Sequence, residues 1–281
     1  MTTQPAIGQD INRKIYLGTG LIEKNRWLNC RDMTKSFPTI LLSNWVERIR
    51  QDGFDGIELW QNHALMCTET EFVRLEQKTV PVAVFNSYVD FDQENDAWRT
   101  KAAEVICRLK AGGVKYNFGN NSSLRETYIR NLRKWVSFLP ADIRILCECH
   151  GGSLTGDDSK IAREIFEELG EKKYQAMVHL NTPLDKLKEW FDSLGGRLTH
   201  THVVLAQRSA NSSVNKLDKL DKKGYTGIEQ NIRFMLESGY RGSFTIEFTS
   251  DITFNPPDTA DIDAVYHNAI DDLNFLRGIL S

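Results

Sequence analysis

The sequence predicts an α/β protein that folds as a single-domain (β/α)8 TIM barrel. Short segments rich in β-branched and aromatic residues alternate with longer amphipathic segments, and eight of each can be counted. The length of 281 residues is also typical of one such barrel. The glycine-rich patterns GxGxxG and GxxxxGK, which mark nucleotide-binding doubly wound sheets, do not occur.

Glycine and proline mark the ends of most of the expected elements. Gly53, Gly112, Pro140 and Gly195 each follow an amphipathic segment, as expected where a helix stops. The expected strands are 14–20, 56–60, 80–86, 114–118, 143–149, 174–180, 198–205 and 243–248. The expected helices are 38–52, 69–78, 95–110, 124–139, 159–169, 184–194, 228–238 and 260–280. The polar, lysine-rich segment 207–227 is expected to be a loop near the active site.

Composition and charge argue against several classes of function. The chain is 41% hydrophobic and 26% charged, and no apolar segment approaches the ~20 residues that cross a membrane. The net charge of −3 lacks the basic excess of proteins that bind nucleic acids. Residues 1–10 show no secretion signal and are expected to form a flexible tail, which indicates a cytoplasmic protein. The five cysteines form no CxxC pair, so reduced thiols are expected.

A carboxylate at the end of a buried strand is the main indication of function. The apolar segment 143–149 contains Glu148, and a buried carboxylate is unfavourable unless a metal, a cation or hydrogen bonds compensate its charge. In TIM barrels the site lies at the C-terminal ends of the strands, where strand alternation selects the inward side chains. The polar residues selected in this way are Glu148, His179, Asn181, His202 and Glu247.

Carboxylate and imidazole groups without a thiolate suit a divalent metal such as Mn2+, Mg2+, Co2+ or Zn2+. Two glutamates would neutralise one dication, and the metal would compensate the buried acids. The alternative is a buried salt bridge from Glu148 or Glu247 to a lysine or arginine. No cationic side chain is expected at an inward strand end apart from Arg208 on the following loop, which favours the metal. His179 and His200 could also be hydrogen-bonded core residues.

These residues resemble the xylose isomerase-like TIM barrel superfamily of sugar isomerases and epimerases. That superfamily also includes inosose dehydratases, hydroxypyruvate isomerases and apurinic-site endonucleases. The resemblance spans nearly the whole chain and rests on four motifs in order. They are Gly53-Phe54-Asp55-Gly56-Ile57-Glu58-Leu59, Glu148-Cys149-His150-Gly151-Gly152, Thr201-His202-Val203, and Gly239-Tyr240-Arg241-Gly242 followed by Ile246-Glu247.

The resemblance implies one metal ion, with Mn2+ as the expected ion, held by Glu148, His202 and Glu247. The fourth ligand of the isomerases is an aspartate on strand six, and its position falls on Asn181. Asparagine offers only a neutral carbonyl oxygen, so either Asn181 or His179 could complete the site. The resemblance also suggests a homo-oligomer, and it places Arg208 near the metal.

The predicted function is that of a metal-dependent isomerase or epimerase acting on a keto- or hydroxy-sugar. The metal would stabilise an enediolate while Glu148 and Glu247 remove and return the proton. The residues expected near strand ends that could bind hydroxyls of a sugar or cyclitol are His150, Arg208, His63, Glu58, Asn86 and Asn117. Two alternatives remain open. One is a lyase or dehydratase that eliminates from a keto-sugar, inosose or keto-glycoside, and the other is a non-catalytic sugar-binding barrel or complex subunit.

Overall fold

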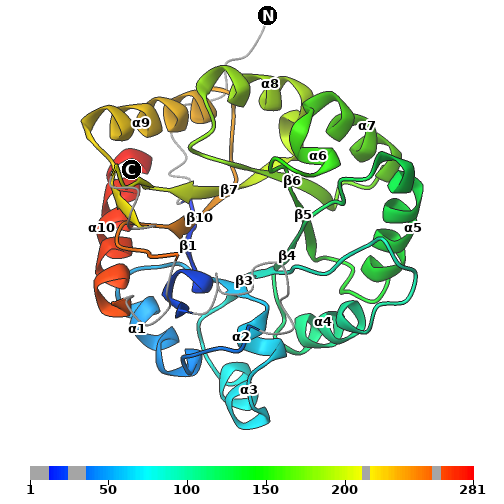
Figure 1. Ribbon diagram of the computed structural model, residues 1–281, viewed down its shortest axis with the longest axis horizontal. Coiled ribbons are helices and arrows are strands. Elements are labelled where there is room, and N and C mark those ends of the chain that lie inside the picture. Colours follow the sequence, from blue (N-terminus) through cyan, green and yellow to red (C-terminus); the bar gives the residue numbers. More distant parts are fainter. Residues whose placement is uncertain (1–12, 25–35, 211–215, 255–260) are drawn as a thin grey trace, which may run out of the picture.

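The computed structural model describes residues 13–24, 36–210, 216–254 and 261–281. Within these residues, eight parallel strands close into a barrel in the order β1–β10–β7–β6–β5–β4–β3–β2, and helices surround it (Figure 1). The predicted single-domain (β/α)8 architecture is confirmed. The expected tail, residues 1–10, lies outside the described residues.

The elements lie close to most of the expected ranges. The barrel strands are β1 (Ile15–Gly18), β2 (Ile57–Trp60), β3 (Val82–Asn86), β4 (Gly113–Tyr116), β5 (Arg144–Glu148), β6 (Tyr174–His179), β7 (Leu198–Val204) and β10 (Ser243–Phe248). The α-helices are α1 (Val46–Gln51), α2 (Asn62–Leu65), α3 (Glu69–Glu76), α4 (Ala97–Arg108), α5 (Arg125–Val136), α6 (Leu154–Asp157), α7 (Ser159–Leu169), α8 (Leu184–Leu194), α9 (Lys222–Glu237) and α10 (Ile262–Leu280). Short 3-10 helices are η1 (Thr19–Ile22), η4 (Leu42–Asn44), η5 (Ser122–Leu124) and η6 (Gly195–Arg197).

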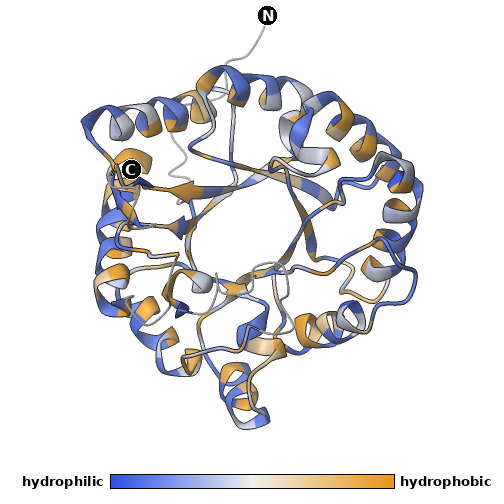
Figure 2. Ribbon diagram, viewed as in Figure 1, coloured by the Kyte–Doolittle hydropathy of each residue, from blue (hydrophilic) through white to orange (hydrophobic). Residues whose placement is uncertain are grey.

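The core has two parts because strand side chains alternate between two faces. Outward residues such as Ile145 and Cys147 pack with the helices, each of which combines hydrophobic and hydrophilic residues (Figure 2). Inside the barrel, Val84, Leu146 and Met177 form a separate, fully buried apolar cluster. On β5 the next inward residue after Leu146 is Glu148, so the polar side chains at this end of the barrel lie over an apolar layer. No helix in the described part of the chain is both long and apolar enough to cross a bilayer.

The segment 38–52 is not the single helix that its apolar spacing predicted. It consists of the 3-10 helix η4 and the short helix α1. Glu71 on α3 explains the break, because its two carboxylate oxygens accept hydrogen bonds from the Ser43 amide at 2.8 Å and the Ser43 hydroxyl at 2.7 Å. The Ser43 amide is thus bonded to α3 and not to a carbonyl group of its own segment.

The segment 207–227 is only partly a loop. The strands β8 (Ala206–Arg208) and β9 (Leu217–Lys219) form an antiparallel pair. Helix α9 begins at Lys222, so the expected start at residue 228 was wrong. The Asp221 carboxylate accepts a hydrogen bond from the Gly224 amide and caps the helix, so helical structure starts within the polar, lysine-rich segment that was expected to be a loop.

Candidate active site and metal centre

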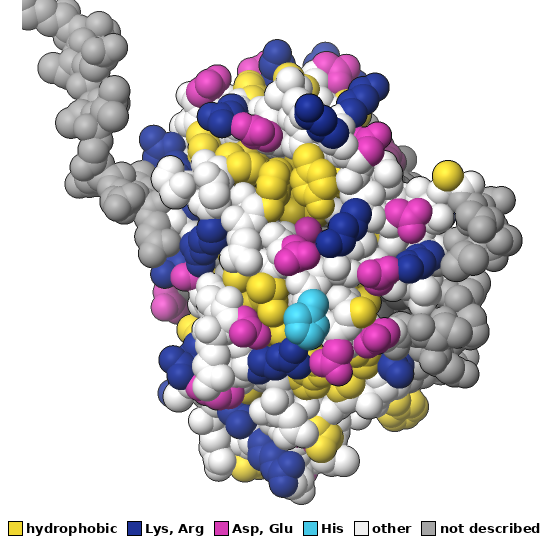
Figure 3. All heavy atoms as spheres, turned by 90° about the vertical axis from the view of Figure 1, so that its left-hand side faces the viewer, with side chains coloured by type: hydrophobic (Ala, Val, Ile, Leu, Met, Phe, Trp, Pro, Cys, Tyr) yellow, Lys and Arg dark blue, Asp and Glu magenta, His cyan; other side chains and the backbone are white. Residues whose placement is uncertain are grey.

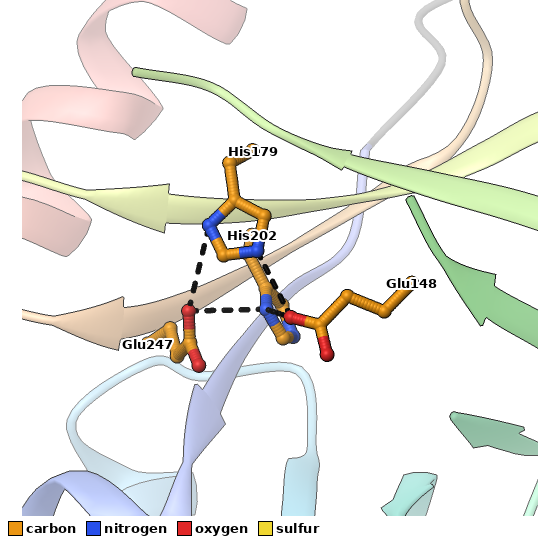
Figure 4. A group of neighbouring side chains, drawn as sticks. All are labelled: Glu148, His179, His202 and Glu247. Carbon is orange, nitrogen blue, oxygen red and sulfur yellow. Dashed lines mark hydrogen bonds and ion pairs between the residues drawn. The ribbon is translucent and has the colours of Figure 1, made fainter. Parts of the chain in front are cut away.

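Four side chains from four strands converge at the C-terminal end of the barrel (Figure 4). Glu148 and His179 are the last residues of β5 and β6, His202 lies on β7, and Glu247 lies on β10. The parallel register aligns them, because His179 pairs with His202 across β6 and β7, and Thr245 pairs with His202 across β10 and β7. Alternation then directs Glu247, two residues after Thr245, to the same interior.

The four groups are in direct contact. The Glu148 Oε1 atom lies 2.9 Å from His179 Nε2 and 3.4 Å from His202 Nδ1. On the other side of the imidazoles, Glu247 Oε2 lies 3.1 Å from His202 Nδ1 and 3.8 Å from His179 Nδ1 (Figure 4). One ligand atom from each residue can be chosen so that all four lie within 4.8 Å of one another. This spacing allows a single cation to contact all four residues.

Glu58 on β2 orients the central imidazole. His202 Nε2 donates to Glu58 Oε1 at 2.8 Å, so the ring presents Nδ1 to Glu148 and Glu247. The other Glu58 oxygen lies 3.2 Å from His200 Nε2, and the Asn86 side-chain amide donates to Oε1 at 2.7 Å. Burial disfavours the charged form, yet His202 and His200 hold the pKa of Glu58 well below its usual range. Glu58 is therefore a buried anion that fixes the orientation of the His202 ring.

The residues fit a divalent cation. His202 Nδ1 is buried and makes no hydrogen bond, although two carboxylates face it, which is the arrangement expected of a metal-ligand nitrogen. Burial favours the neutral imidazole, but Glu247 and Glu58 raise the pKa of His202 well above its usual range, so positive charge is favoured at this point. Nitrogen and carboxylate donors without thiolates suit Mn2+, Mg2+, Co2+ or Zn2+.

A buried lysine also compensates Glu148, and the sequence-based expectation that no cation lies at an inward strand end apart from Arg208 was wrong. Lys115 on β4 is 1% exposed and donates to Glu148 Oε2 at 2.7 Å. The Asn117 side chain accepts from Lys115 Nζ at 2.7 Å and donates to the same Glu148 oxygen at 2.8 Å. Alternation could have found Lys115, because Val114 and Tyr116 on either side of it face the helices.

Because of this lysine, the two oxygens of the Glu148 carboxylate have different partners. Oε2 is occupied by Lys115 and Asn117, whereas Oε1 faces His179 and His202. Although burial raises the pKa of Glu148, Lys115, His179 and His202 together hold it well below its usual range. Burial also opposes the charge on Lys115, but Glu148 outweighs that effect and raises its pKa. The pair is therefore charged in the folded protein.

The structure places the other candidate site residues at different depths. Asn181 is exposed in the turn after β6, whereas His179 reaches Glu148. His63 is buried on α2 and contacts Thr19 at 2.9 Å and Glu23 at 3.1 Å. Three of the candidates for hydroxyl binding lie at or near the rim, which is the C-terminal edge of the barrel. His150 is exposed, and its ring centre lies 5.0 Å from that of His179. Asn117 is half-buried, and Arg208 is exposed on the β8–β9 hairpin.

A cavity of about 470 Å3 opens beside the cluster at the ends of β5 and β6. His179 and His150 line it together with Lys160, Lys186 and Trp190. Its size is within the range of small-molecule pockets, and its lining combines charged and aromatic side chains. The cavity thus provides polar space next to the candidate metal ligands.

Comparisons with known proteins support the fold. Neither a protein-family model nor a curated protein matches the sequence. Among solved structures, a D-psicose 3-epimerase determined in the presence of D-fructose is 12% identical with a TM-score of 0.65, over 95% of this chain and 99% of that one. The 3-keto-D-glucoside 4-epimerase from E. coli is 14% identical with a TM-score of 0.57, over 95% and 100%. Endonuclease IV from Thermus thermophilus is 14% identical with a TM-score of 0.57, over 84% and 94%.

The protein therefore has the fold of the xylose isomerase-like TIM barrels, which its sequence motifs resemble. The solved structures of this fold include both epimerases and an endonuclease, and identities this low establish the architecture alone. Function must be argued from the residues at the strand ends.

Proposed function

We propose that this protein is a divalent-metal-dependent isomerase or epimerase acting on a keto- or hydroxy-sugar through an enediolate. The observation that supports it most strongly is the position of Glu148 and Glu247, which contact the same nitrogen of His202 from strands on either side of β6 and β7. Two carboxylates on different strands suit a reaction that removes a proton from carbon and returns one elsewhere. The epimerases of this fold whose structures were determined in the presence of D-fructose or with D-tagatose support the substrate class.

In this proposal Glu148, His179, His202 and Glu247 hold the cation, with Mn2+ as the expected ion. His179 takes the fourth place because its imidazole already contacts Glu148, whereas Asn181 is exposed in the following turn. A bound dication supplies Lewis acidity that polarises the substrate carbonyl. Its two charges also compensate carboxylates that are buried in the barrel.

The remaining roles belong to the side chains of the chain itself. One of the two glutamates accepts the proton from carbon and the other donates a proton to the neighbouring carbon or to the opposite face. Asn117 and His150, which lie at the rim, bind hydroxyl groups. Glu58 and Asn86 lie deeper in the barrel, where Glu58 positions His202 and Asn86 donates a hydrogen bond to Glu58. His63 is buried and contacts Glu23 and Thr19. We therefore assign these three residues a positioning role and not substrate contact.

Elimination is the second candidate reaction, because the imidazoles of His179 and His150 lie beside Glu148 and could supply an acid. His150 stands next to His179 and faces the cavity of about 470 Å3, where an acid could protonate a leaving oxygen. The first proton abstraction would be the same as in isomerisation. The two reactions differ only in whether a β-oxygen substituent leaves after the carbon is deprotonated.

The test is a panel of keto-sugars, inososes and keto-glycosides incubated with the Mn2+-loaded protein in deuterated water and followed by NMR. Isomerisation replaces a carbon-bound hydrogen with deuterium and keeps all heavy atoms of the substrate, whereas elimination releases water or an aglycone. Glu148→Gln and Glu247→Gln should each abolish exchange, whereas Glu104→Gln, at an exposed position on α4, should not. Absence of exchange with every compound, although the protein binds a sugar, would leave the non-catalytic barrel as the explanation.

A further inference from the structure

A second cavity, of about 520 Å3, lies at the opposite end of the barrel from the candidate active site. Its walls come from the starts of strands, including Tyr16, Arg144 and Thr199, and from the turns that lead into β7 and β10. The second of these turns contains Gly239-Tyr240-Arg241-Gly242, a motif that the proposed function does not use. The amino-terminal end of a TIM barrel is not its catalytic end, so this cavity needs a separate explanation.

The charge of this cavity is unbalanced. Arg13, Lys14, Arg144 and Arg241 line it, and none of the described lining residues is an aspartate or glutamate. By contrast, basic and acidic side chains lie side by side on the face around α10 (Figure 3). Lys14 has an acid partner outside the cavity, Asp55, at 3.0 Å. The three arginines are therefore the source of the excess positive charge.

None of the three guanidinium groups has a carboxylate partner in the described residues. Arg13 Nε is buried without any hydrogen bond. Arg144 makes only long contacts to main-chain oxygens, 3.5 Å to Gly112 and 3.4 Å to Ala83, and Arg241 donates to the main-chain oxygen of Tyr240. Burial and, after it, the nearby charge of Arg241 lower the pKa of Arg13, as expected for two guanidinium groups of like charge at one cavity.

The backbone holds Arg241 at the cavity. Gly239 adopts a φ of +85°, which favours glycine, and a Cβ at Gly242 would meet the main-chain oxygen of Thr199 at 2.2 Å. The Tyr240 hydroxyl donates to the Ser243 carbonyl at 2.8 Å and fixes the turn from inside. The fold thus brings these positive charges together at one cavity, where a bound anion would compensate them.

We propose that this basic cavity binds a small phosphorylated metabolite. Arginine forks match phosphate oxygens in geometry and charge, and the volume is within the range of small-molecule sites. Thr199 donates to Gln175 Oε1 at 2.6 Å, which leaves the Gln175 amide nitrogen to donate to a ligand. Phe191 and Tyr16 supply apolar surface for the body of the metabolite. The inference is independent of the reaction at the other end of the barrel.

Isothermal titration with glycerol 3-phosphate at low ionic strength tests the proposal, with inorganic phosphate as a second probe and glycerol as the uncharged control. Wild-type protein should bind both anions and not glycerol. Arg13→Gln/Arg241→Gln should bind about tenfold or more weakly, because two charge-assisted contacts are lost. Arg233→Gln, which removes an exposed arginine from α9, should bind as the wild type does.

Two further measurements keep the result interpretable. Glu247→Gln should retain anion binding, because a phosphate bound at the metal centre would respond to that change. Without anion, Arg241→Gln should melt at or above the wild-type temperature, because it relieves the repulsion of Arg13. Equal binding by the wild type and the double variant, absence of binding by the wild type, or loss of binding in Glu247→Gln would overturn the proposal.

Discussion

At the scale of single residues, the contact between Lys115 and Glu148 is the most consequential. Both groups are charged and almost fully buried, and Asn117 bridges them. A buried ion pair is weak evidence for stability as such, but removing one partner leaves an uncompensated charge in the barrel. Lys115 therefore holds the Glu148 carboxylate in a fixed position and leaves Oε1 as the oxygen that faces His179 and His202.

Replacing Lys115 with methionine should lower the free energy of unfolding by about 3–5 kcal/mol, because Glu148 then lacks its buried counter-charge. Urea unfolding measures this change. The double variant Lys115→Met/Glu148→Gln should recover part of the loss, since it removes both charges, and the double-mutant cycle gives their coupling. Additive effects in that cycle would contradict a direct role for the ion pair.

Glu58→Gln tests whether Glu58 positions His202. Glutamine keeps the size of the side chain but no longer provides the negative charge that orients His202 Nε2–H. Mn2+ affinity should fall by about 10- to 100-fold, as is usual when the hydrogen-bond partner of a metal-binding histidine is changed. Titration calorimetry with Mn2+ measures the change, with the exposed Glu104→Gln as the control. Unchanged affinity would show that the ring orientation does not depend on Glu58.

At the scale of elements, the connection between β5 and α6 positions the rim of the site. A Cβ at Gly156 would lie 1.7 Å from the main-chain oxygen of His150, so no larger residue fits without moving that loop. Gly156→Ala should destabilise the protein by about 1–3 kcal/mol and should displace His150. Thermal unfolding and the NMR signals of His150 measure the two effects.

The matched control for that change is Gly227→Ala, on α9. A Cβ at Gly227 meets nothing within 4 Å, and the residue lies inside a helix. Alanine there should stabilise the protein by about 0.5–1 kcal/mol through helix propensity. If the two alanine variants behaved alike, the close packing of α6 on the β5 loop would be disproved.

Helix α10 contains a buried acid whose charge opposes folding. Burial raises the pKa of Asp272 from 3.8 to about 7, the neighbouring Asp271 adds to this shift, and the charge of Lys219 opposes it only in part. The folded state thus binds the Asp272 proton more tightly than the unfolded state does, so this group makes stability fall as pH rises from about 4 to about 7.

Asp272→Asn removes that titration. It should raise the free energy of unfolding by about 2–4 kcal/mol at pH 8 and change it little at about pH 3, where the acid is mostly protonated in both states. Chemical unfolding at the two pH values measures the difference. The exposed Asp192→Asn on α8 is the control, and an equal effect of Asp272→Asn at both pH values would contradict the assignment.

At the scale of the whole molecule, metal binding should be linked to stability and to protons. Because a ligand that binds only the folded state stabilises it, Mn2+ at about 100 times its Kd should add about 2.7 kcal/mol. The raised pKa of His202 means that a proton must leave Nδ1 before a cation binds, so Mn2+ affinity should increase with pH.

Thermal unfolding with Mn2+ or a chelator, and calorimetry in buffers of different ionisation enthalpy, measure these two effects. Glu148→Gln and Glu247→Gln should lose most of the Mn2+ stabilisation, whereas Glu104→Gln should keep it. Stabilisation that survives in both glutamine variants at the site would show that Mn2+ binds elsewhere.

The sequence by itself determined the barrel and most of the candidate site. Strand periodicity and the glycine and proline stops predicted the eight βα units, because backbone geometry depends mainly on nearby residues. Alternation alone placed Glu148, His202 and Glu247 on inward positions at strand ends, and the structure brings these three together.

Only the tertiary structure decided how those groups are paired. Glu58 and His202 are hydrogen-bonded although they are 144 residues apart in the chain, and Lys115 donates to Glu148 from 33 residues away. The contact of His179, rather than Asn181, with Glu148 likewise depends on where β6 ends relative to β5 and β7, which no local pattern specifies. The physical reason is that the burial of a side chain and the identity of its charged neighbours depend on contacts between distant strands, and these contacts form only when the barrel closes.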